Sequence, residues 1–280
     1  MKADIWIFDR LPVRGHMQLL GLKYNKMMSP VAFRKFPEFI MTDPLLKITD
    51  LNTFYGKTQI LKAIDLQVHP AELVVIAGPN GAGKTTLLKS ILGLSEVTRT
   101  GTILLNRRKI TKKKTHKITA MGVGYVPQGR LLFPSMSVDE HLHFAGYKFR
   151  KKSQWPPAAI YGLFPELQER MNVPGTRLSG GEQRMMAIGQ ALVSNPALLL
   201  LDEPSEGLSM RIIQRLEEVC RFLKSQGMAI LLVEQNLELA QALADRAYFF
   251  SNGKIEQEIG GDAFRNDQAT VCKYSETCIN

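Results

Sequence analysis

Cysteine is scarce in this sequence, and its few cysteines are not spaced to act together. They are Cys220, Cys272 and Cys278. They form no CxxC pair and have no histidine at metal-ligand spacing, so the sequence indicates neither a disulfide framework nor a zinc site. This sparse use of cysteine favours a protein of a reducing cytosol.

Long hydrophobic runs are missing as well. No apolar stretch approaches the roughly 20 residues that a membrane-spanning helix requires. The short apolar segment Ile5–Phe8 is followed at once by Asp9 and Arg10, which excludes the apolar core of a signal peptide. If this protein serves a membrane, we expect other chains to cross it.

Acidic residues are in deficit. The chain has 36 lysines and arginines against 26 aspartates and glutamates, a net charge of +10. Much of the excess lies in two clusters: Arg107, Arg108, Lys109, Lys112, Lys113, Lys114 and Lys117, and then Lys148, Arg150, Lys151 and Lys152. A solvated surface is the usual role of such clusters, and anionic lipid headgroups are the alternative. Nucleic acid is disfavoured as a partner, because few aromatic residues interleave with these charges.

Residues 1–40 differ in pattern from the rest of the chain. They are basic, are broken by Pro12, Pro30 and Pro37, and show no sustained hydrophobic periodicity. We therefore expect residues 1–44 to be an unordered basic extension or the result of a misassigned start. A lipid-binding arm is a further alternative.

From Met41 onward, strand-like and helical segments alternate. Strands are predicted at Leu45–Leu51, 64–68, Glu72–Ala77, Thr102–Leu105, Gly124–Val126, Ala197–Leu201 and Met228–Val233, with a hairpin over Tyr248–Ile259 that turns at Asn252 and Gly253. Helices are predicted at Lys84–Leu94, within 135–172, at about 180–194, at Arg211–Ser225 and at Leu237–Asp245. This alternation indicates an α/β fold around a parallel sheet.

A glycine-rich segment between a predicted strand and a predicted helix carries the clearest chemical signal. Residues 78–85, Gly-Pro-Asn-Gly-Ala-Gly-Lys-Thr, fit the pattern GxxxxGK[ST]. Glycines let backbone N–H groups wrap closely around phosphate oxygens, and the helix N-terminus adds partial positive charge. We expect Lys84 to contact the β- and γ-phosphates of ATP, and the Thr85 hydroxyl to ligate Mg²⁺. The expected nucleotide-binding residues here are Gly78, Pro79, Asn80, Gly81, Ala82, Gly83, Lys84, Thr85 and Thr86.

Two adjacent carboxylates follow another apolar strand. Asp202 and Glu203 come directly after Leu198–Leu201. A carboxylate at the end of a strand beside a phosphate loop can hold Mg²⁺, directly or through water. The next carboxylate can then accept a proton from the attacking water. We therefore expect Asp202 on the metal and Glu203 as the general base; without the phosphate loop, a helix cap would be the simpler interpretation.

Residues 178–184, Leu-Ser-Gly-Gly-Glu-Gln-Arg, resemble the signature motif of ABC ATPases, which is highly specific. The family's other motifs lie in the expected order. Tyr55 resembles the aromatic residue that stacks on adenine, and Gln128 resembles the glutamine of the Q-loop, a ligand of the metal. Residues 205–209 occupy the place of the D-loop. The resemblance covers about residues 45–260.

This resemblance implies a P-loop NTPase of the ABC ATPase type. The fold class would be α/β, with a mostly parallel core sheet, an antiparallel β subdomain and a helical subdomain. The ATPase domain is expected at 45–262, its helical subdomain at about 129–178, and a C-terminal tail at 263–280. The implied cofactors are ATP and Mg²⁺.

The signature motif also implies a partner. Ser179, Gly180 and Gly181 begin a predicted helix and can form a second anion site there. In this family that site faces the γ-phosphate bound to a partner subunit, so two ATP molecules lie between two head-to-tail domains. The chain has one phosphate loop and one signature, so a second nucleotide-binding domain would complete each site.

One position departs from the family pattern. The family usually has a histidine after the last core strand, and Gln235 stands here instead. A glutamine can donate a hydrogen bond to phosphate but cannot carry charge, which puts a switch role at this position in doubt. The stretch Leu-Val-Glu-Gln-Asn at 232–236 resembles the smaller ATPases of branched-chain amino acid importers and the similar urea importers. In such importers the second ATPase is a different chain.

The function implied is ATP hydrolysis that powers an importer at the cytoplasmic face of the membrane. Branched-chain amino acids are the leading substrate, and urea or short amides are the alternative. Permease subunits and, indirectly, a substrate-binding protein would be its partners, and nucleic acid would not. A soluble ABC ATPase of translation or DNA repair is the alternative, but such proteins usually carry two ATPase domains or a long coiled-coil insert. An inactive regulatory subunit is disfavoured, because Lys84, Asp202 and Glu203 are all present.

Overall fold

Two β-sheets organise the described part of the computed structural model, which is residues 43–129, 132–147 and 153–267. A six-stranded sheet has the order β10-β9-β3-β8-β7-β6, and a four-stranded sheet has the order β2-β1-β4-β5. Within these described ranges, no helix is long and apolar enough to cross a membrane.

The six-stranded sheet contains the strands that lead to the predicted chemical motifs. Its members are β3 (Leu73–Ala77), β6 (Val123–Val126), β7 (Leu198–Asp202), β8 (Ala229–Glu234), β9 (Arg246–Ser251) and β10 (Lys254–Gly260). All neighbouring pairs are parallel except β9 and β10, which form the predicted hairpin. β3, β7 and β8 are buried throughout, as expected for parallel strands covered on both faces.

The smaller sheet is antiparallel. Its strands are β1 (Leu46–Tyr55), β2 (Thr58–Val68), β4 (Thr98–Leu105) and β5 (Arg108–Lys109). β1 lies in the middle and pairs with β2 and with β4. Buried and exposed residues alternate along parts of β1 and β2, which is typical of a sheet with one face in the core and one in water.

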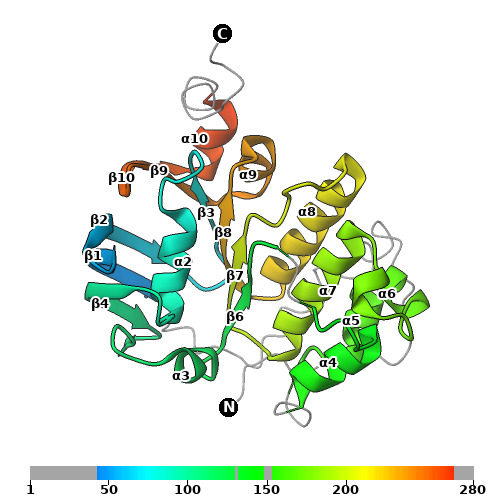
Figure 1. Cartoon of the computed structure of the whole chain (residues 1–280). Coiled ribbons are helices and arrows are strands. Elements are labelled where there is room, and N and C mark those ends of the chain that lie inside the picture. The colour runs from blue at the N-terminus through cyan, green and yellow to red at the C-terminus, as the bar shows by residue number, and fades with distance from the viewer. Residues whose placement is uncertain (1–42, 130–131, 148–152, 268–280) are drawn as a thin grey trace, which may run out of the picture.

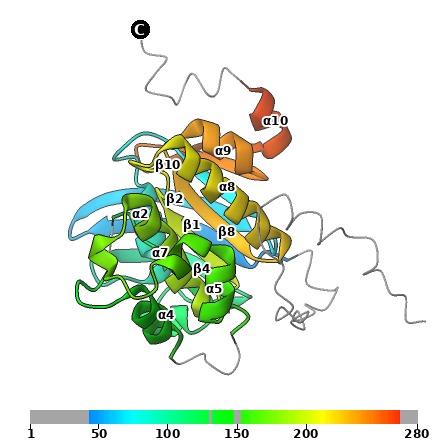
Figure 2. The ribbon, with the colours of Figure 1, turned by 90° about the vertical axis from the view of Figure 1, so that its right-hand side faces the viewer.

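The helices divide into two groups around the sheets (Figure 1). They are α2 (Lys84–Leu92), α3 (Thr115–Thr119), α4 (Val138–Gly146), α5 (Pro157–Leu163), α6 (Pro165–Glu169), α7 (Gly180–Val193), α8 (Met210–Ser225), α9 (Leu237–Leu243) and α10 (Gly261–Asn266), with a 3₁₀ turn η3 at Gly175–Arg177. α2 packs beside the smaller sheet, whereas α4 to α7 gather on the far side of β6 and β7. Figure 2 shows α8 and α9 in front of β8.

The core has two parts, one on each face of the six-stranded sheet. Val75 of β3 and Leu201 of β7 join a cluster with the helices α4 to α9. Their neighbours Val74 and Leu200 join a second cluster with α2 and the smaller sheet. Successive strand residues point to opposite faces, so each central strand supplies both clusters. The sheet therefore holds α2 and the helical group at fixed positions on either side.

Several element boundaries differ from those predicted. α2 ends at Leu92, because Gly93 adopts a left-handed φ of 68°. α9 ends at Leu243, and the Asp245 carboxylate instead accepts a 2.8 Å hydrogen bond from the backbone N–H of Leu73. The short elements α3 and β5 had no sequence signal. α10 lies across the domain boundary expected at residue 262, and its buried Phe264 packs on Phe249.

Some expectations fall on residues outside the described ranges. These include the basic extension, Cys272, Cys278 and the second cationic cluster at 148–152. The first cationic cluster is described. All its members are exposed except the half-buried Lys113, and Arg107 forms an ion pair with Asp43. A solvated surface accounts for these side chains.

Candidate active site

Most of the predicted site residues meet at the carboxyl edge of the parallel sheet. β3 leads into the phosphate loop, β7 ends at Asp202, β6 leads to Gln128, and β8 leads to Gln235. The strand ends pair in register at this edge: Ala77 lies opposite Glu234, and Asp202 lies opposite Val233. Loops at the carboxyl ends of parallel strands are the usual place for a ligand site in open α/β sheets.

Glycines are required in the phosphate loop by backbone angle and by lack of space. Gly78 has φ of 149°, and a Cβ there would lie 2.3 Å from the carbonyl oxygen of Phe250. Gly83 has φ of 106°, and a Cβ would lie 2.8 Å from Leu61 Cδ2. α2 begins immediately afterwards, so its unpaired N–H groups face the loop. The loop therefore has the backbone geometry that the motif predicts for a phosphate cradle.

Lys84 joins the phosphate loop to the acidic strand end. Its side chain is buried, and Nζ donates hydrogen bonds to the carbonyl oxygens of Gly78 at 2.8 Å and Pro79 at 3.0 Å. The same nitrogen lies 3.3 Å from Oε1 of Glu203. The structure thus brings together a cation and a carboxylate that are far apart in the sequence. Phosphate bound in the loop would lie within reach of both.

Asp202 is held by two hydroxyl groups. Thr85 Oγ1 donates to Oδ1 at 3.0 Å, and the Tyr125 hydroxyl donates to Oδ2 at 3.1 Å. Burial raises the pKa of Asp202, and these two hydrogen bonds act in the opposite direction. A neighbouring hydroxyl and carboxylate suit Mg²⁺, which prefers oxygen ligands and keeps waters and substrate phosphates for its other positions. Among the described residues, no group of three or more His, Cys, Asp and Glu side chains forms a complete metal site.

Tyr125 was not among the predicted site residues. It belongs to β6 and pairs in register with Leu200 of β7, two residues before Asp202. Burial raises the pKa of its hydroxyl, which keeps the proton available for donation to Asp202. The only sequence signal was a polar aromatic residue near the end of an apolar strand.

Glu203 has an unusual backbone conformation. Its φ is 45°, in the left-handed region that non-glycine residues rarely adopt, and such strain is often found at functional sites. Its N–H donates to the carbonyl of Val233 at 2.9 Å, and its own carbonyl accepts from Arg184 Nη2 at 3.3 Å. These contacts aim the carboxylate toward Lys84 and Gln128.

Gln128 lies between two carboxylates. Its amide nitrogen donates to Glu203 at 3.1 Å and to Glu206 at 3.0 Å, which leaves the amide oxygen as its acceptor and as the atom able to ligate a metal. Arg184 fixes the start of this loop through a 3.1 Å hydrogen bond to the carbonyl of Pro127. The structure therefore places Gln128 beside the predicted base.

Tyr55 lies at the end of β1, half-buried, and Lys89 Nζ of α2 is 5.8 Å from the centre of its ring. This contact places the ring against the helix that begins at the phosphate loop. The position is compatible with an aromatic surface beside a nucleotide. Gln235 follows β8 at the same sheet edge, and its N–H donates to the Glu234 carboxylate at 3.2 Å.

The signature residues form a separate helix start. The exposed Ser179 caps α7, since its Oγ accepts from the Glu182 N–H at 3.3 Å and its own N–H donates to Glu182 at 2.7 Å. Gly181 is needed for packing, because a Cβ there would lie 3.0 Å from Ile212 of α8. Within the described residues, no hydrogen bond or ion pair joins Ser179 to the phosphate loop.

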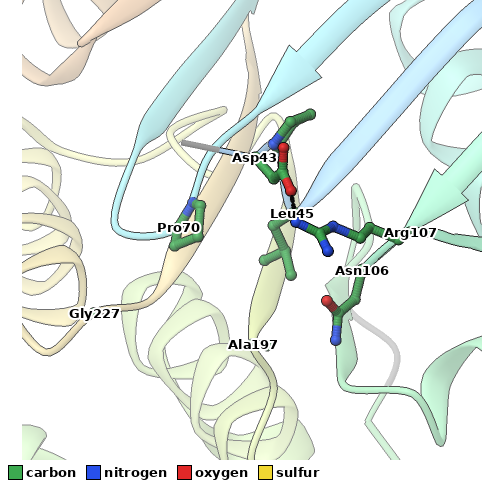
Figure 3. Close-up of a pocket in the computed structure, with 8 residues that line it drawn as sticks. Asp43, Leu45, Pro70, Asn106, Arg107, Ala197 and Gly227 are labelled. Carbon is green, nitrogen blue, oxygen red and sulfur yellow. Dashed lines mark ion pairs between the residues drawn. The ribbon is translucent and has the colours of Figure 1, made fainter. Parts of the chain in front are cut away.

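A small cavity at the opposite edge of the sheet does not belong to this site (Figure 3). It has a volume of about 20 Å³ and is lined by residues that precede β1, β3, β7 and β8, among them Leu45, Pro70, Ala197 and Gly227. That is room for roughly one water molecule. We therefore assign no ligand to it.

Comparison with known proteins agrees with the geometry. Residues 61–206 match the family model described as ABC transporter. The chain is 39% identical over 221 residues to BraG, a high-affinity branched-chain amino acid transport ATP-binding protein of Pseudomonas aeruginosa; the match covers 78% of this chain and 94% of BraG. It is 35% identical over 213 residues to LivF, a probable branched-chain amino acid transport ATP-binding protein of Archaeoglobus fulgidus, covering 75% and 90% of the two chains.

A solved structure of an ATP-binding subunit of an ABC transporter superposes with a TM-score of 0.69 at 28% identity, covering 79% of this chain and 92% of that one. These matches extend over most of the chain. The phosphate loop, the acidic strand end and the signature helix indicate the same family. This chain belongs to the ABC transporter family and is one of its ATP-binding, ATP-hydrolysing subunits.

Proposed function

We propose that this chain is one of two ATPases in a motor that powers the import of branched-chain amino acids. The observation that carries the proposal is the division of the site. Lys84, Asp202 and Glu203 converge on one phosphate loop, whereas the signature serine Ser179 lies exposed at a separate helix start. A second ATPase subunit would bring its own signature to this loop and complete the site.

In this proposal each site residue has a defined task. The phosphate loop from Gly78 to Thr86 binds the phosphates of ATP, and Tyr55 stacks on the adenine. Thr85, Asp202 and Gln128 hold Mg²⁺, which would neutralise phosphate charge. Glu203 accepts the proton of the attacking water, and Gln235 donates a hydrogen bond near the γ-phosphate.

The proposed assembly is driven by charge. Two phosphate loops and two exposed helix N-termini carry positive potential, and ATP phosphates between them would compensate it. We therefore expect ATP to close the two subunits, and loss of the γ-phosphate to let them part. That opening and closing would be transmitted to the permease subunits.

Replacing Ser179 with arginine should block closure and leave ATP binding to the separate chain nearly intact. The new side chain would add bulk and positive charge at the subunit contact. Light scattering during chromatography with ATP, in a Glu203→Gln background and with the cognate ATPase supplied, should show dimer for the parent and monomer for the Ser179→Arg variant.

Ser137→Arg provides a matched control. Ser137 caps α4 through the same reciprocal hydrogen bonds, made there with Glu140, so both variants lose a comparable capping contact of about 1 kcal/mol. Only the change at Ser179 should affect the dimer. Normal dimerisation of the Ser179→Arg variant would rule out the shared site.

We propose that the surface of α4 contacts the permease. Phe133, Phe144 and Tyr147 are 53%, 65% and 69% exposed, an unusual density of large apolar side chains. α4 also borders a cavity of about 240 Å³. It is lined by Leu142, His143, Gly146, Ser153, Trp155, Pro156, Pro157 and Val193. A helix of a membrane-spanning partner would cover these rings and reach the cavity.

Replacing both Phe144 and Tyr147 with serine should weaken co-purification with the permease by at least about tenfold, because each ring is expected to bury apolar area worth about 1–2 kcal/mol. ATP binding by the separate chain should not change. Met210→Ser, at a 59% exposed residue of α8, is the control for loss of an exposed apolar side chain. Retention of the permease by the double variant would exclude this surface.

The proposed substrate rests on BraG and LivF, whose names both specify branched-chain amino acid transport. The chain would act at the cytoplasmic face of the membrane, with permease subunits and a substrate-binding protein as further components. Uptake of labelled leucine by the assembled importer tests this directly. ATP-dependent uptake of urea without uptake of leucine would change the proposed substrate to urea, while the proposed motor function would stand.

A further inference from the structure

Glu234 is a buried carboxylate with no task in the mechanism proposed so far. It is the last residue of β8 and is 1% exposed. Oε1 accepts a 2.9 Å hydrogen bond from the N–H of Ser205, and Oε2 accepts a 2.8 Å hydrogen bond from the Ser205 hydroxyl. Oε2 also accepts hydrogen bonds from the N–H of Gln235 at 3.2 Å and from the N–H of Asn236 at 3.3 Å.

These contacts come from two different loops. Ser205 belongs to the loop after β7, whereas Gln235 and Asn236 belong to the loop after β8. One side chain therefore holds both loops at the carboxyl edge of the sheet. Directly beside it in the register is Ala77, the last residue before the phosphate loop.

Burial of this carboxylate carries a desolvation cost, and packing alone does not explain why a carboxylate occupies this position. None of the ion pairs between described residues includes Glu234. Burial raises its pKa, and the hydrogen bonds from Ser205 and Asn236 act in the opposite direction. An apolar residue would fill the same position without the desolvation penalty. The hydrogen bonds to the two loops are what the carboxylate provides.

Both loops carry residues of the proposed reaction. Glu203 lies two residues before Ser205, and its N–H is bonded to Val233, the neighbour of Glu234. Glu206 follows Ser205 and accepts a hydrogen bond from Gln128. Gln235, on the other loop, follows Glu234 directly. A shift of Ser205 relative to β8 would thus move the base and the Gln128 contact together.

We propose that Glu234 is a positioning residue that couples the loop 203–209 to Gln235, so that the base and the γ-phosphate contact keep one relative geometry during turnover. This inference rests on the proposed roles of Glu203 and Gln235. Glu234 itself touches neither nucleotide nor water in this scheme; it acts through Ser205 and the backbone of Gln235.

The principal test is Glu234→Gln in the full-length chain. The amide has almost the same shape but turns one acceptor into a donor, so at least one N–H or O–H group loses its partner. We expect kcat for ATP hydrolysis to fall about 10- to 100-fold, since small displacements of reacting groups have effects of that order. The KM for ATP should stay within about twofold of the wild-type value, because the phosphate loop is held by hydrogen bonds to other residues. Equal kcat for variant and wild type would overturn the proposal.

Asp245→Asn is the matched control for stability. Its carboxylate also accepts a backbone N–H, that of Leu73, but at the opposite end of β3. We expect this variant to lower Tm without changing kcat. If both variants lower Tm and kcat in the same proportion, Glu234 is only a structural residue. A second variant, Ser205→Ala, should lower kcat, and its combination with Glu234→Gln should show less than the additive effect.

Hydrogen exchange separates this inference from the proposed function. In Glu234→Gln, backbone amides at 204–209 and at 235–239 should exchange faster together, while those of α2 do not change. Faster exchange in one loop only, or in neither, contradicts the coupling even if the wild type shows no turnover. An inactive wild type with coupled exchange would instead refute the assigned chemistry of the site.

Discussion

Replacing Glu203 with glutamine should abolish most ATP turnover while ATP binding is retained. The amide keeps the size of the side chain and can accept a hydrogen bond, but it cannot take up the proton of the attacking water. Removal of a general base typically lowers the rate by about 10²- to 10⁴-fold. Phosphate release measured at saturating ATP and Mg²⁺, together with a nucleotide-binding titration, gives both quantities.

Glu206→Gln is the matched control for this change. Glu206 lies three residues further along the loop and accepts from the same Gln128 amide nitrogen, but it is exposed and has no contact with Lys84 in the described geometry. We expect it to keep at least about a third of the wild-type rate, since exposed contacts of this kind contribute little. If the two variants lose activity equally, or if Glu203→Gln hydrolyses ATP normally, Glu203 is not the base.

Lys84→Ala should have the largest effect on ATP binding. The buried ammonium lies at the loop and beside Glu203, where it can contact the β- and γ-phosphates. A hydrogen bond to a charged group contributes about 1.5–3 kcal/mol, which corresponds to a loss of affinity of about 10- to 150-fold. Titration with a fluorescent ATP analogue measures it.

The substitution also leaves Glu203 without the cation that lies 3.3 Å away, so Tm should be recorded for the same preparation. Lys62→Ala, at an exposed lysine of β2, controls for loss of one positive charge. Affinity should not change in that control. Unaltered affinity in Lys84→Ala, with the fold intact, would remove the phosphate-loop assignment.

Much of the candidate nucleotide site could be predicted because its signals are local. The phosphate loop needs glycines at fixed spacing, a lysine and a hydroxyl, all within the nine residues from Gly78 to Thr86. The signature and the acidic pair after β7 are equally local. The central apolar strands were predicted for the same reason, since strands buried on both faces are continuous apolar runs.

Short elements were harder to predict. β5 and α3 span two and five residues, too few to show a hydrophobic period. α10 has one strong apolar anchor, Phe264, and its burial depends on Phe249 in a distant part of the chain. The observed ends of α2 and α9 differ from the predicted ends for similarly specific reasons. A glycine in a left-handed conformation follows α2, and a carboxylate that is hydrogen-bonded to another strand follows α9.

The sequence by itself determined the class of protein and singled out the candidate phosphate-binding segment and the pair of carboxylates beside it, because each depends on residues close together in the chain. Only the tertiary structure decided that Tyr125 bonds to Asp202, that Glu203 lies between Lys84 and Gln128, and that Glu234 joins two loops. Those contacts follow from the order and register of parallel strands. Long-range pairing of that kind depends on how the whole sheet assembles, and no local pattern of residues specifies it.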